Sequence, residues 1–377
     1  MRSSRLTVAV VASTALAFVG TAGASAQTST ATKAPKAPRV VTLTDRVLAP
    51  FQIAVRDGYL VHDGSVYVAD GGTGKVSRIR SNGSLATIAS FTGKETDVAG
   101  LSWSRSGRTL AWTSTDHGKE ESWLNLTRSD VGTQRFSLSA YEKSANPDGD
   151  AHYGIKNPTQ CQIDAFKKLG PDAPPASYTG IKDSHPYSVV QWGDYWVVAD
   201  AGGNDLVKVD AQGKISTVAV LPPQPVKITK AMATANKLPS CLVGATYAFE
   251  PVPTDVEVGP GGLLYVTTLP GGPEDPSLGA RGSVYVVNGY TGKSARIATG
   301  FAGATNLALA GRTIYVTELF AGRISTVSHG MPRPYLSLPG ALSVEYSGGH
   351  LYAATMAPMD PKTGKPTGKG RVVEIRR

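Results

Sequence analysis

Few residues of this chain have the type and spacing that chemistry requires. His185 stands just before an alternating apolar strand pattern and is followed by Pro186 and Tyr187. At that place it could act as a general base or as a metal ligand. It could equally bond a loop carbonyl where the strand begins. No second histidine stands at ligand spacing, and no serine or cysteine nucleophile motif accompanies it. The sequence therefore favours the structural interpretation.

Oxygen ligands for a hard cation are also sparse. Aligning the repeats described below places one residue of each copy at the start of its first strand: Gln52, Gly100, Ser188, Asp255, Asn306 and Ser343. Ca²⁺ takes six or more oxygen ligands, several of them usually from carboxylates. This ring offers only Asp255 and Asn306, with Asp97 and Asp183 as candidate neighbours. A Ca²⁺ ion in the channel, held by Asp255 and Asn306, is therefore kept as an alternative.

Other residues have both a functional and a structural interpretation. Arg281 lies in "PGGPEDPSLGARG" (270–282), which could be a lid over a ligand or a loop bonded to itself. Four aromatic residues could stack on a ring-shaped ligand or form a small core of their own, which we favour: Tyr178, Tyr187, Tyr247 and Phe249. Three acids that follow second strands are expected to close loops through backbone N–H groups: Asp70, Asp200 and Glu318. The candidate ligand-binding residues are His185, Tyr187, Asp255, Asn306 and Arg281.

A repeated strand–turn–strand unit must position these residues. "YSVVQWGDYWVVAD" (187–200) recurs at 254–268, 305–318 and 342–355, with a longer turn at 51–70 and a divergent copy at 99–114. Most copies continue into a third and a fourth strand. Four-stranded units at periods of about 40 residues or more predict an all-β protein, a β-propeller of six blades. The last copy lacks a fourth strand, and "RVVTLT" (39–44) is expected to pair with it and close the ring.

The long segments are expected on one face of this propeller. Turns between first and second strands are short, whereas the long segments join second to third strands or one blade to the next: 142–184, 222–252, 270–282 and 357–369. Antiparallel pairing puts all of these connections on the same side. Cys161 and Cys241 lie in the two longest insertions, at 142–184 and 222–252. We expect a disulfide between them, worth roughly 3–5 kcal/mol in a chain-entropy model.

The ends of the chain predict its location. Arg2 and Arg5, an apolar run at 6–19 and the small residues "ASA" (24–26) indicate a secretory signal peptide at 1–26. A Thr-, Ala-, Pro- and Lys-rich linker follows at 27–38, and the propeller occupies 39–377. The apolar run is too short for a membrane anchor, so we expect an exported protein with no transmembrane segment. The net charge of +9 lies mostly at the two ends, so nucleic acid is not an expected partner.

The repeats and insertions together resemble the ScyD/ScyE family of exported bacterial proteins. The resembling stretches include "SYTGIKDSHPYSVV" (177–190), "ADAGGNDLVKVD" (199–210) and the long fourth-blade motif at 238–288, and they cover nearly the whole mature chain. The second blade departs from the pattern at "WLNLTRSDVGTQRFSL" (123–138). The resemblance implies an exported six-bladed propeller that is NHL- or gluconolactonase-like. It implies no settled activity and therefore no catalytic residue.

Two functions remain open on the sequence. The favoured one is a monomeric exported propeller that binds a small molecule, a cell-surface polymer or a protein on its elaborated face, without catalysis. The alternative is a metal-dependent enzyme of the lactonase or hydrolase type with a cation in its channel. Propellers host both functions, so the fold does not choose between them.

Overall fold

A computed structural model describes residues 38–170, 173–272, 276–360 and 362–376. The predicted signal peptide (1–26) and all but the last residue of the predicted linker (27–38) lie outside the described residues. Within the described part of the chain, no helix is long and apolar enough to cross a membrane.

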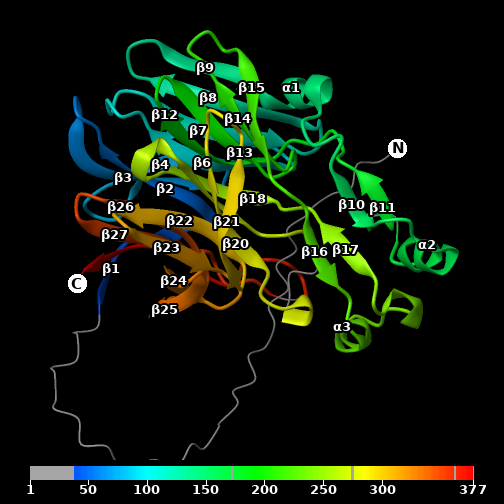
Figure 1. Cartoon of the computed structure of the whole chain (residues 1–377). Coiled ribbons are helices and arrows are strands. Elements are labelled where there is room, and N and C mark those ends of the chain that lie inside the picture. The colour runs from blue at the N-terminus through cyan, green and yellow to red at the C-terminus, as the bar shows by residue number, and fades with distance from the viewer. Residues whose placement is uncertain (1–37, 171–172, 273–275, 361, 377) are drawn as a thin grey trace, which may run out of the picture.

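Six four-stranded antiparallel sheets stand around one axis (Figure 1). The first blade consists of β2(Pro50–Asp57), β3(His62–Asp70), β4(Lys75–Ile79) and β5(Leu85–Ser90). The second consists of β6(Thr96–Trp103), β7(Leu110–Asp116), β8(Glu121–Arg128) and β9(Gly132–Ser137). The third consists of β12(Pro186–Trp192), β13(Tyr195–Asp200), β14(Asp205–Val209) and β15(Ile215–Val220). The fourth blade consists of β18(Pro253–Val258), β19(Leu264–Thr268), β20(Gly282–Val287) and β21(Ser294–Phe301). The fifth consists of β22(Ala304–Ala310), β23(Thr313–Glu318), β24(Arg323–Ser328) and β25(Met331–Ser337). The sixth consists of β26(Ala341–Ser347), β27(His350–Thr355), β28(Gly370–Arg376) and the N-terminal strand β1(Arg39–Val47).

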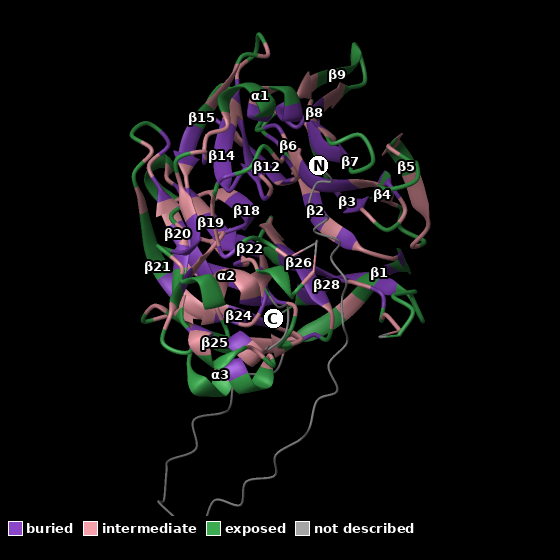
Figure 2. Cartoon of the chain, turned by 90° about the vertical axis from the view of Figure 1, so that its right-hand side faces the viewer, coloured by how far each residue is buried: buried purple, intermediate pink, exposed green. Residues whose placement is uncertain are grey.

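The ring closes as predicted. The first strands of the blades contact one another in the cyclic order β2, β6, β12, β18, β22, β26 and back to β2. Figure 2, which looks onto one end of the ring, shows these six strands innermost. The N-terminal strand β1 pairs with β28, with Arg39 opposite Arg376. Closure therefore removes an open sheet edge that would otherwise pair with another chain.

Apolar side chains fill the spaces between blades because strand residues alternate between the two faces of each sheet. Between the third and fourth blades, Val197, Leu206, Val256 and Leu264 are all fully buried. Similar clusters fill the other spaces between blades, for example that between the fifth and sixth. The apolar core is thus divided into wedges, and each wedge holds two neighbouring blades together.

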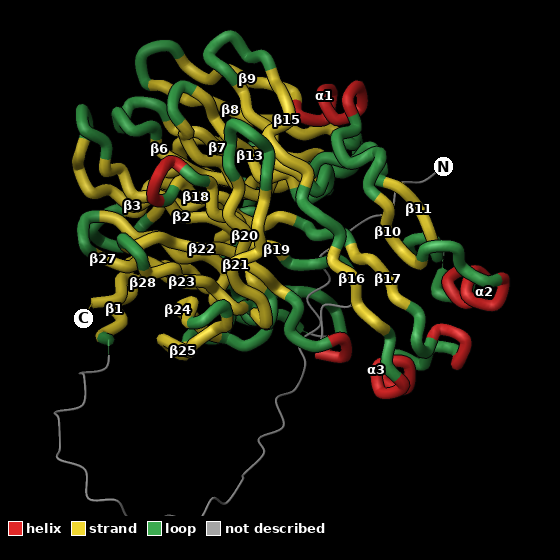
Figure 3. Tube along the Cα trace, in the orientation of Figure 1, coloured by secondary structure: helices red, strands yellow, loops and turns green. Residues whose placement is uncertain are grey.

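A seventh four-stranded sheet stands outside the ring, and the sequence did not predict it. Its order is β11(Ser177–Thr179), β10(His152–Ile155), β17(Thr246–Phe249), β16(Gln224–Lys227), so both long insertions contribute to it. We call it the cap sheet. Helices α2(Gln160–Lys167) and α3(Lys230–Ala235) pack beside it, and α1(Leu138–Ala145) precedes it (Figure 3). Strands of three or four residues are too short to show a periodic pattern in the sequence.

The cap has its own core. Tyr247 is 3% exposed and packs with Ile155, Leu242 and the partly buried Phe249. The interpretation of Tyr247 and Phe249 as core residues is confirmed. Three 3-10 turns complete the helical segments: η1(Ser240–Leu242), η2(Pro260–Gly262) and η3(Pro276–Leu278).

The predicted disulfide joins the two insertions. Cys161 lies in α2 and Cys241 in η1, with their Cα atoms 6.4 Å apart. Gln162 supports the same contact, because its Nε2 donates to the carbonyl of Cys241 at 3.0 Å. The bridge closes a loop across the whole third blade, since the two cysteines are 80 residues apart.

Replacing both cysteines by serine is expected to lower the free energy of unfolding by about 3–5 kcal/mol, because the unfolded chain regains the entropy of that loop. Thermal or urea unfolding of the double variant beside the oxidised wild type measures the change. Equal stabilities would show that the bridge forms without constraining the unfolded chain.

Candidate functional site

The ring residues at the starts of the inner strands bond one blade to the next. Asp255 Oδ2 accepts from the N–H of Leu307 at 2.8 Å, and Asn306 Oδ1 accepts from the N–H of Val344 at 2.8 Å. Three further contacts follow the same plan: Gln52 Oε1 with Leu101 N–H at 2.6 Å, Ser188 Oγ with Val256 N–H at 3.3 Å, and Ser343 Oγ with Pro50 C=O at 3.2 Å. We call this set the blade latch.

Gly100 is the sixth ring residue, and it has no side chain to offer. A Cβ at this position would lie 3.0 Å from the backbone of Ser188. The glycine therefore allows the second and third blades to approach closely at the channel.

Asp255 has no free oxygen to offer a cation. Its Oδ1 accepts from Ser188 Oγ at 2.5 Å and from Gln52 Nε2 at 3.1 Å, and its side chain is fully buried. Burial raises the pKa of Asp255 to about 6, although its hydrogen bonds oppose the shift. The side-chain oxygen of Asn306 likewise accepts a hydrogen bond of the blade latch. Because these oxygens already accept hydrogen bonds, Asp255 and Asn306 do not fit a channel Ca²⁺ ion in this arrangement. The channel Ca²⁺ ion therefore stays a prediction from the sequence.

A different cluster lies at the mouth of the channel, on the face where the inner strands begin, which we call the capped face. Asp97 Oδ2 lies 2.8 Å from His117 Nε2 and 3.1 Å from His185 Nε2. The two imidazole rings meet edge to face, with centroids 4.6 Å apart. One ligand atom from each residue lies within 4.8 Å of the others. We call these three residues the mouth site.

Two neighbouring blades position the mouth site. Asp97 is the second residue of β6, and His117 directly follows β7 in the same blade, where its N–H donates to the carbonyl of Glu95 at 2.9 Å. His185 precedes β12 of the third blade, and its N–H donates to Asp200 Oδ1 at 2.7 Å. Backbone contacts therefore hold both histidines in place.

His185 was a candidate from the sequence, and its partner His117 was not. His117 is distant in the chain and carries no local motif, so ligand spacing could not reveal it. One signal was present: His117 follows a second strand, and such positions share a face with the starts of first strands. His185 therefore has the second histidine that the linear spacing lacked.

The charges of the mouth site support one another. Burial alone would raise the pKa of Asp97, but the charge of His185 and the hydrogen bonds from both histidines bring it well below its ordinary value. Burial alone would lower the pKa of His185, and the carboxylate of Asp97 raises it overall. In the metal-free protein the site therefore favours a carboxylate beside a protonated imidazole.

An aromatic wall borders the mouth site. The ring centroid of Tyr187 lies 4.6 Å from that of His185, and Phe51 meets Tyr187 at 5.6 Å. The side chain of His117 is 38% exposed, against 13% for His185. The site thus opens to solvent beside His117 and is closed by aromatic rings behind His185. Tyr187 belongs to this site and not to the core of the cap.

The remaining candidates have structural contacts. Arg281 donates to the carbonyls of Gly271 and Pro270 at 3.0 and 3.3 Å, and its guanidinium lies 4.5 Å from the ring centroid of Phe249. These contacts tie the 270–282 loop to the cap sheet. The acids predicted to close loops do so: Asp70 accepts from the N–H of Ala49, Asp200 from that of His185 and Glu318 from that of Ala302.

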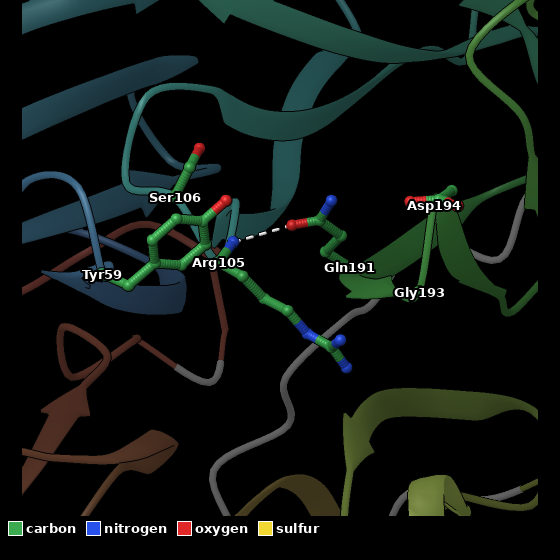
Figure 4. A pocket seen from close by; sticks show the side chains of 6 residues that line it. All are labelled: Tyr59, Arg105, Ser106, Gln191, Gly193 and Asp194. Atoms are coloured by element: carbon green, nitrogen blue, oxygen red, sulfur yellow. Dashed lines mark hydrogen bonds between the residues drawn. The ribbon is translucent and has the colours of Figure 1, made fainter.

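A hollow of about 320 Å³ lies on the opposite face, among the short turns (Figure 4). Six residues line it: Tyr59, Arg105, Ser106, Gln191, Gly193 and Asp194. Gln191 is held there by its Oε1, which accepts from the N–H of Arg105 at 2.7 Å. None of the residues predicted from the sequence as ligand-binding lines this hollow.

No family model matches the sequence, and no curated protein matches it. Solved structures share its fold. The PQQ-bound aldose sugar dehydrogenase from Streptomyces coelicolor aligns with a TM-score of 0.53 and 11% identity over 91% of this chain and 99% of that chain. The gluconolactonase XC5397 from Xanthomonas campestris aligns with a TM-score of 0.51 and 12% identity over 90% and 89%. A virginiamycin B lyase from Staphylococcus aureus has a TM-score of 0.48. At such identities the likeness shows a β-propeller and no activity.

Replacing Asn306 by leucine is expected to destabilise the fold by about 1–3 kcal/mol, because the buried N–H of Val344 loses its acceptor. Urea unfolding measures the change, and Asn82→Leu on an exposed turn serves as the control. If the Asn306→Leu variant is as stable as the control, the blade latch does not stabilise the fold.

Replacing Asp97 by asparagine is expected to destabilise metal-free protein more at pH 5.5 than at pH 9, by roughly 1–3 kcal/mol. The raised pKa of His185 means that the pair stabilises the fold fully below pH 6.5, and that this contribution is lost as the pH rises through the raised value. The lowered pKa of Asp97 keeps the carboxylate ionised at pH 5.5. Thermal unfolding in EDTA at both pH values checks the sign. An equal loss at both would show that no ion pair forms.

Proposed function

We propose that the protein is a metal-dependent hydrolase of a small ester or lactone and works at the mouth site. One observation carries this proposal: Asp97, His117 and His185 bring two imidazole nitrogens and one carboxylate oxygen within 4.8 Å of one another. This is the enzyme alternative of the sequence analysis, with the metal ligands moved from Asp255 and Asn306 to the mouth site.

The donor set fits a borderline divalent ion such as Zn²⁺. Nitrogen ligands favour such ions over Ca²⁺, and catalytic zinc sites keep three protein ligands and an open position. When bound there, the ion supplies an acidified water and polarises a substrate carbonyl. His117, which is 38% exposed, marks the side from which a substrate reaches the site. Asp97 Oδ1 is buried and has no hydrogen-bond partner among the described residues, so the carboxylate keeps a lone pair to offer.

The chain's other residues orient both ligands and substrate. Asp200 fixes the backbone of His185, and the carbonyl of Glu95 fixes that of His117. Tyr187 and Phe51 present an aromatic surface beside the imidazoles, against which the apolar part or the ring of a substrate packs. Remote contacts of this kind hold the reacting carbonyl in place.

Binding without turnover is the second candidate, and the aromatic wall favours it as well. A small molecule, an envelope polymer or a protein side chain could rest on Tyr187 and Phe51 without reacting. Export and membership of the ScyD/ScyE family also remain proposals. The disulfide supports export, because such bonds persist in oxidising compartments.

Replacing His117 by alanine is expected to weaken Zn²⁺ binding by at least about tenfold, because the open side of the site loses its ligand. Isothermal titration of mature protein with Zn²⁺ measures the affinity, and His62→Ala, an exposed histidine at the start of β3, is the control. Binding is also expected to tighten from pH 5.5 to pH 8, because His185 must lose its proton to bind the metal.

Assays of the Zn²⁺-loaded protein on chromogenic esters and on sugar lactones then separate the two candidates. Turnover that His117→Ala abolishes and His62→Ala preserves supports the hydrolase. Metal binding without turnover on either class leaves the binding function. Wild-type protein that takes up no Zn²⁺, Mn²⁺ or Co²⁺ overturns the metal proposal.

A further inference from the structure

Three acids are buried together where the first insertion meets the third blade. Glu142 belongs to α1, Asp148 to the loop after it, and Asp205 is the first residue of β14. Their exposed fractions are 3%, 1% and 1%. We call them the acid cluster. None of them belongs to the mouth site or to the blade latch.

The acid cluster contains several oxygens without hydrogen-bond partners among the described residues. Both carboxylate oxygens of Asp205 are in this state, as are Glu142 Oε1 and Asp148 Oδ1. The side-chain oxygen of Asn146, the residue that ends α1, is a fifth such atom. Buried polar atoms are nearly always paired in folded proteins, so five unpaired oxygens on neighbouring segments require an explanation.

Two of the carboxylates approach each other at one turn, and the third is bonded to that turn. A Cβ on Gly203 would lie 3.2 Å from Asp205 Oδ1 and 3.3 Å from Glu142 Oε2, so both oxygens approach the same point. Asp148 is drawn to this turn by Asn204, whose Nδ2 donates to Asp148 Oδ2 at 3.0 Å. Glycine at 203 leaves room between the carboxylates that a side chain would fill.

No positive charge balances the acid cluster within the described part of the chain. No ion pair joins any of its members to a lysine, arginine or histidine, and their charged neighbours include the further acids Asp183 and Asp200. Lys182 acts on Glu142 only as the smallest of the influences. Burying unpaired carboxylates costs several kcal/mol each, so the cluster must bind either protons or a cation.

The pKa values of the three acids reflect the same burial and the same lack of positive charge. Burial, and then the charges of Asp200 and Asp148, raise the pKa of Glu142 to about 8. Burial also raises the pKa of Asp148 and of Asp205. Carboxyl groups that would hold protons near neutral pH exchange them readily for a divalent cation, which removes the repulsion among all three.

We propose that Glu142, Asp148 and Asp205 form a Ca²⁺ site that joins the cap insertion to the third blade. The donors are all oxygens, which Ca²⁺ prefers and Zn²⁺ does not. The three carboxylates would provide at least three of the six to eight ligands that Ca²⁺ takes once their side chains turn toward one ion, because Asp148 Oδ1 lies against Gly180 in the ion-free chain.

Such a site would stabilise the neighbouring mouth. The turn that carries Gly203 and Asp205 begins at Asp200, which bonds the backbone N–H of His185. The cation would therefore link α1, the start of β14 and the segment that positions His185. It differs from the mouth site in its ligands, so the two bind different metals.

The test uses mature protein freed of metal by EDTA and a chelating resin, at pH 7.5. Titration calorimetry with CaCl₂ is expected to give binding with a dissociation constant of about 10⁻⁶ to 10⁻³ M. Saturating Ca²⁺ is expected to raise Tm by several degrees, because it binds only the folded chain. Asp205→Asn and Glu142→Gln are each expected to weaken Ca²⁺ binding by at least about tenfold.

The two variants have a second signature. Without Ca²⁺ they are expected to be as stable as the wild type or more stable, because each removes an acid whose raised pKa lowers the free energy of unfolding at pH 7.5. A residue that merely supported the fold would lower Tm in both conditions. Asp194→Asn, which removes an exposed acid from a turn of the same blade, and His117→Ala are the controls and keep the full Ca²⁺ response.

Two results overturn the proposal. The first is wild-type protein that binds no Ca²⁺ and shows no change in Tm, which would mean that the acid cluster is neutralised by protons alone. The second is a Ca²⁺ response that persists undiminished in Asp205→Asn and Glu142→Gln, which would place the cation elsewhere.

Discussion

Hydrogen bonds that join five of the six inner strands to the next are the constraint on which the rest of the molecule depends. Asp255 and Asn306 each reach across the channel edge to a backbone N–H of the following blade. Such bonds fix the angle between blades at the axis, while the apolar wedges fix it further out. The pairing of β1 with β28 then completes the circle. Asp255 and Asn306, which the sequence offers as metal ligands, therefore bond one blade to the next.

Three aspartates show how its partners decide what a carboxylate does. Asp255 is surrounded by N–H and O–H donors and serves the scaffold. Asp97 faces two imidazoles, and its carboxylate holds the pKa of His185 above the ordinary value. The carboxylate of Asp205 has no hydrogen-bond partner among the described residues and must be neutralised by a proton or a cation from solution. The residue type is the same in each case, and only the neighbours differ.

The elaborated face concentrates these features because of chain direction. Connections between blades and loops after second strands emerge on one side of the ring, so the cap sheet, the mouth site and the acid cluster share that side. The structural neighbours include a gluconolactonase and an aldose sugar dehydrogenase on the same fold. A scaffold that serves such different chemistries leaves function to the residues grafted on its face.

The sequence by itself determined the six blades, the closing strand and the disulfide partners. Alternating strands and glycine turns are local patterns that repeat, and a pair of cysteines in insertions on one face has few other options. Only the tertiary structure brought His117 to His185 and gathered Glu142, Asp148 and Asp205 around one turn. It also showed that Asp255 bonds the backbone of the next blade. These contacts join residues of different blades and insertions that are far apart in the chain. The folding of the ring brings them together, and the spacing of residues in the sequence carries no signal of it.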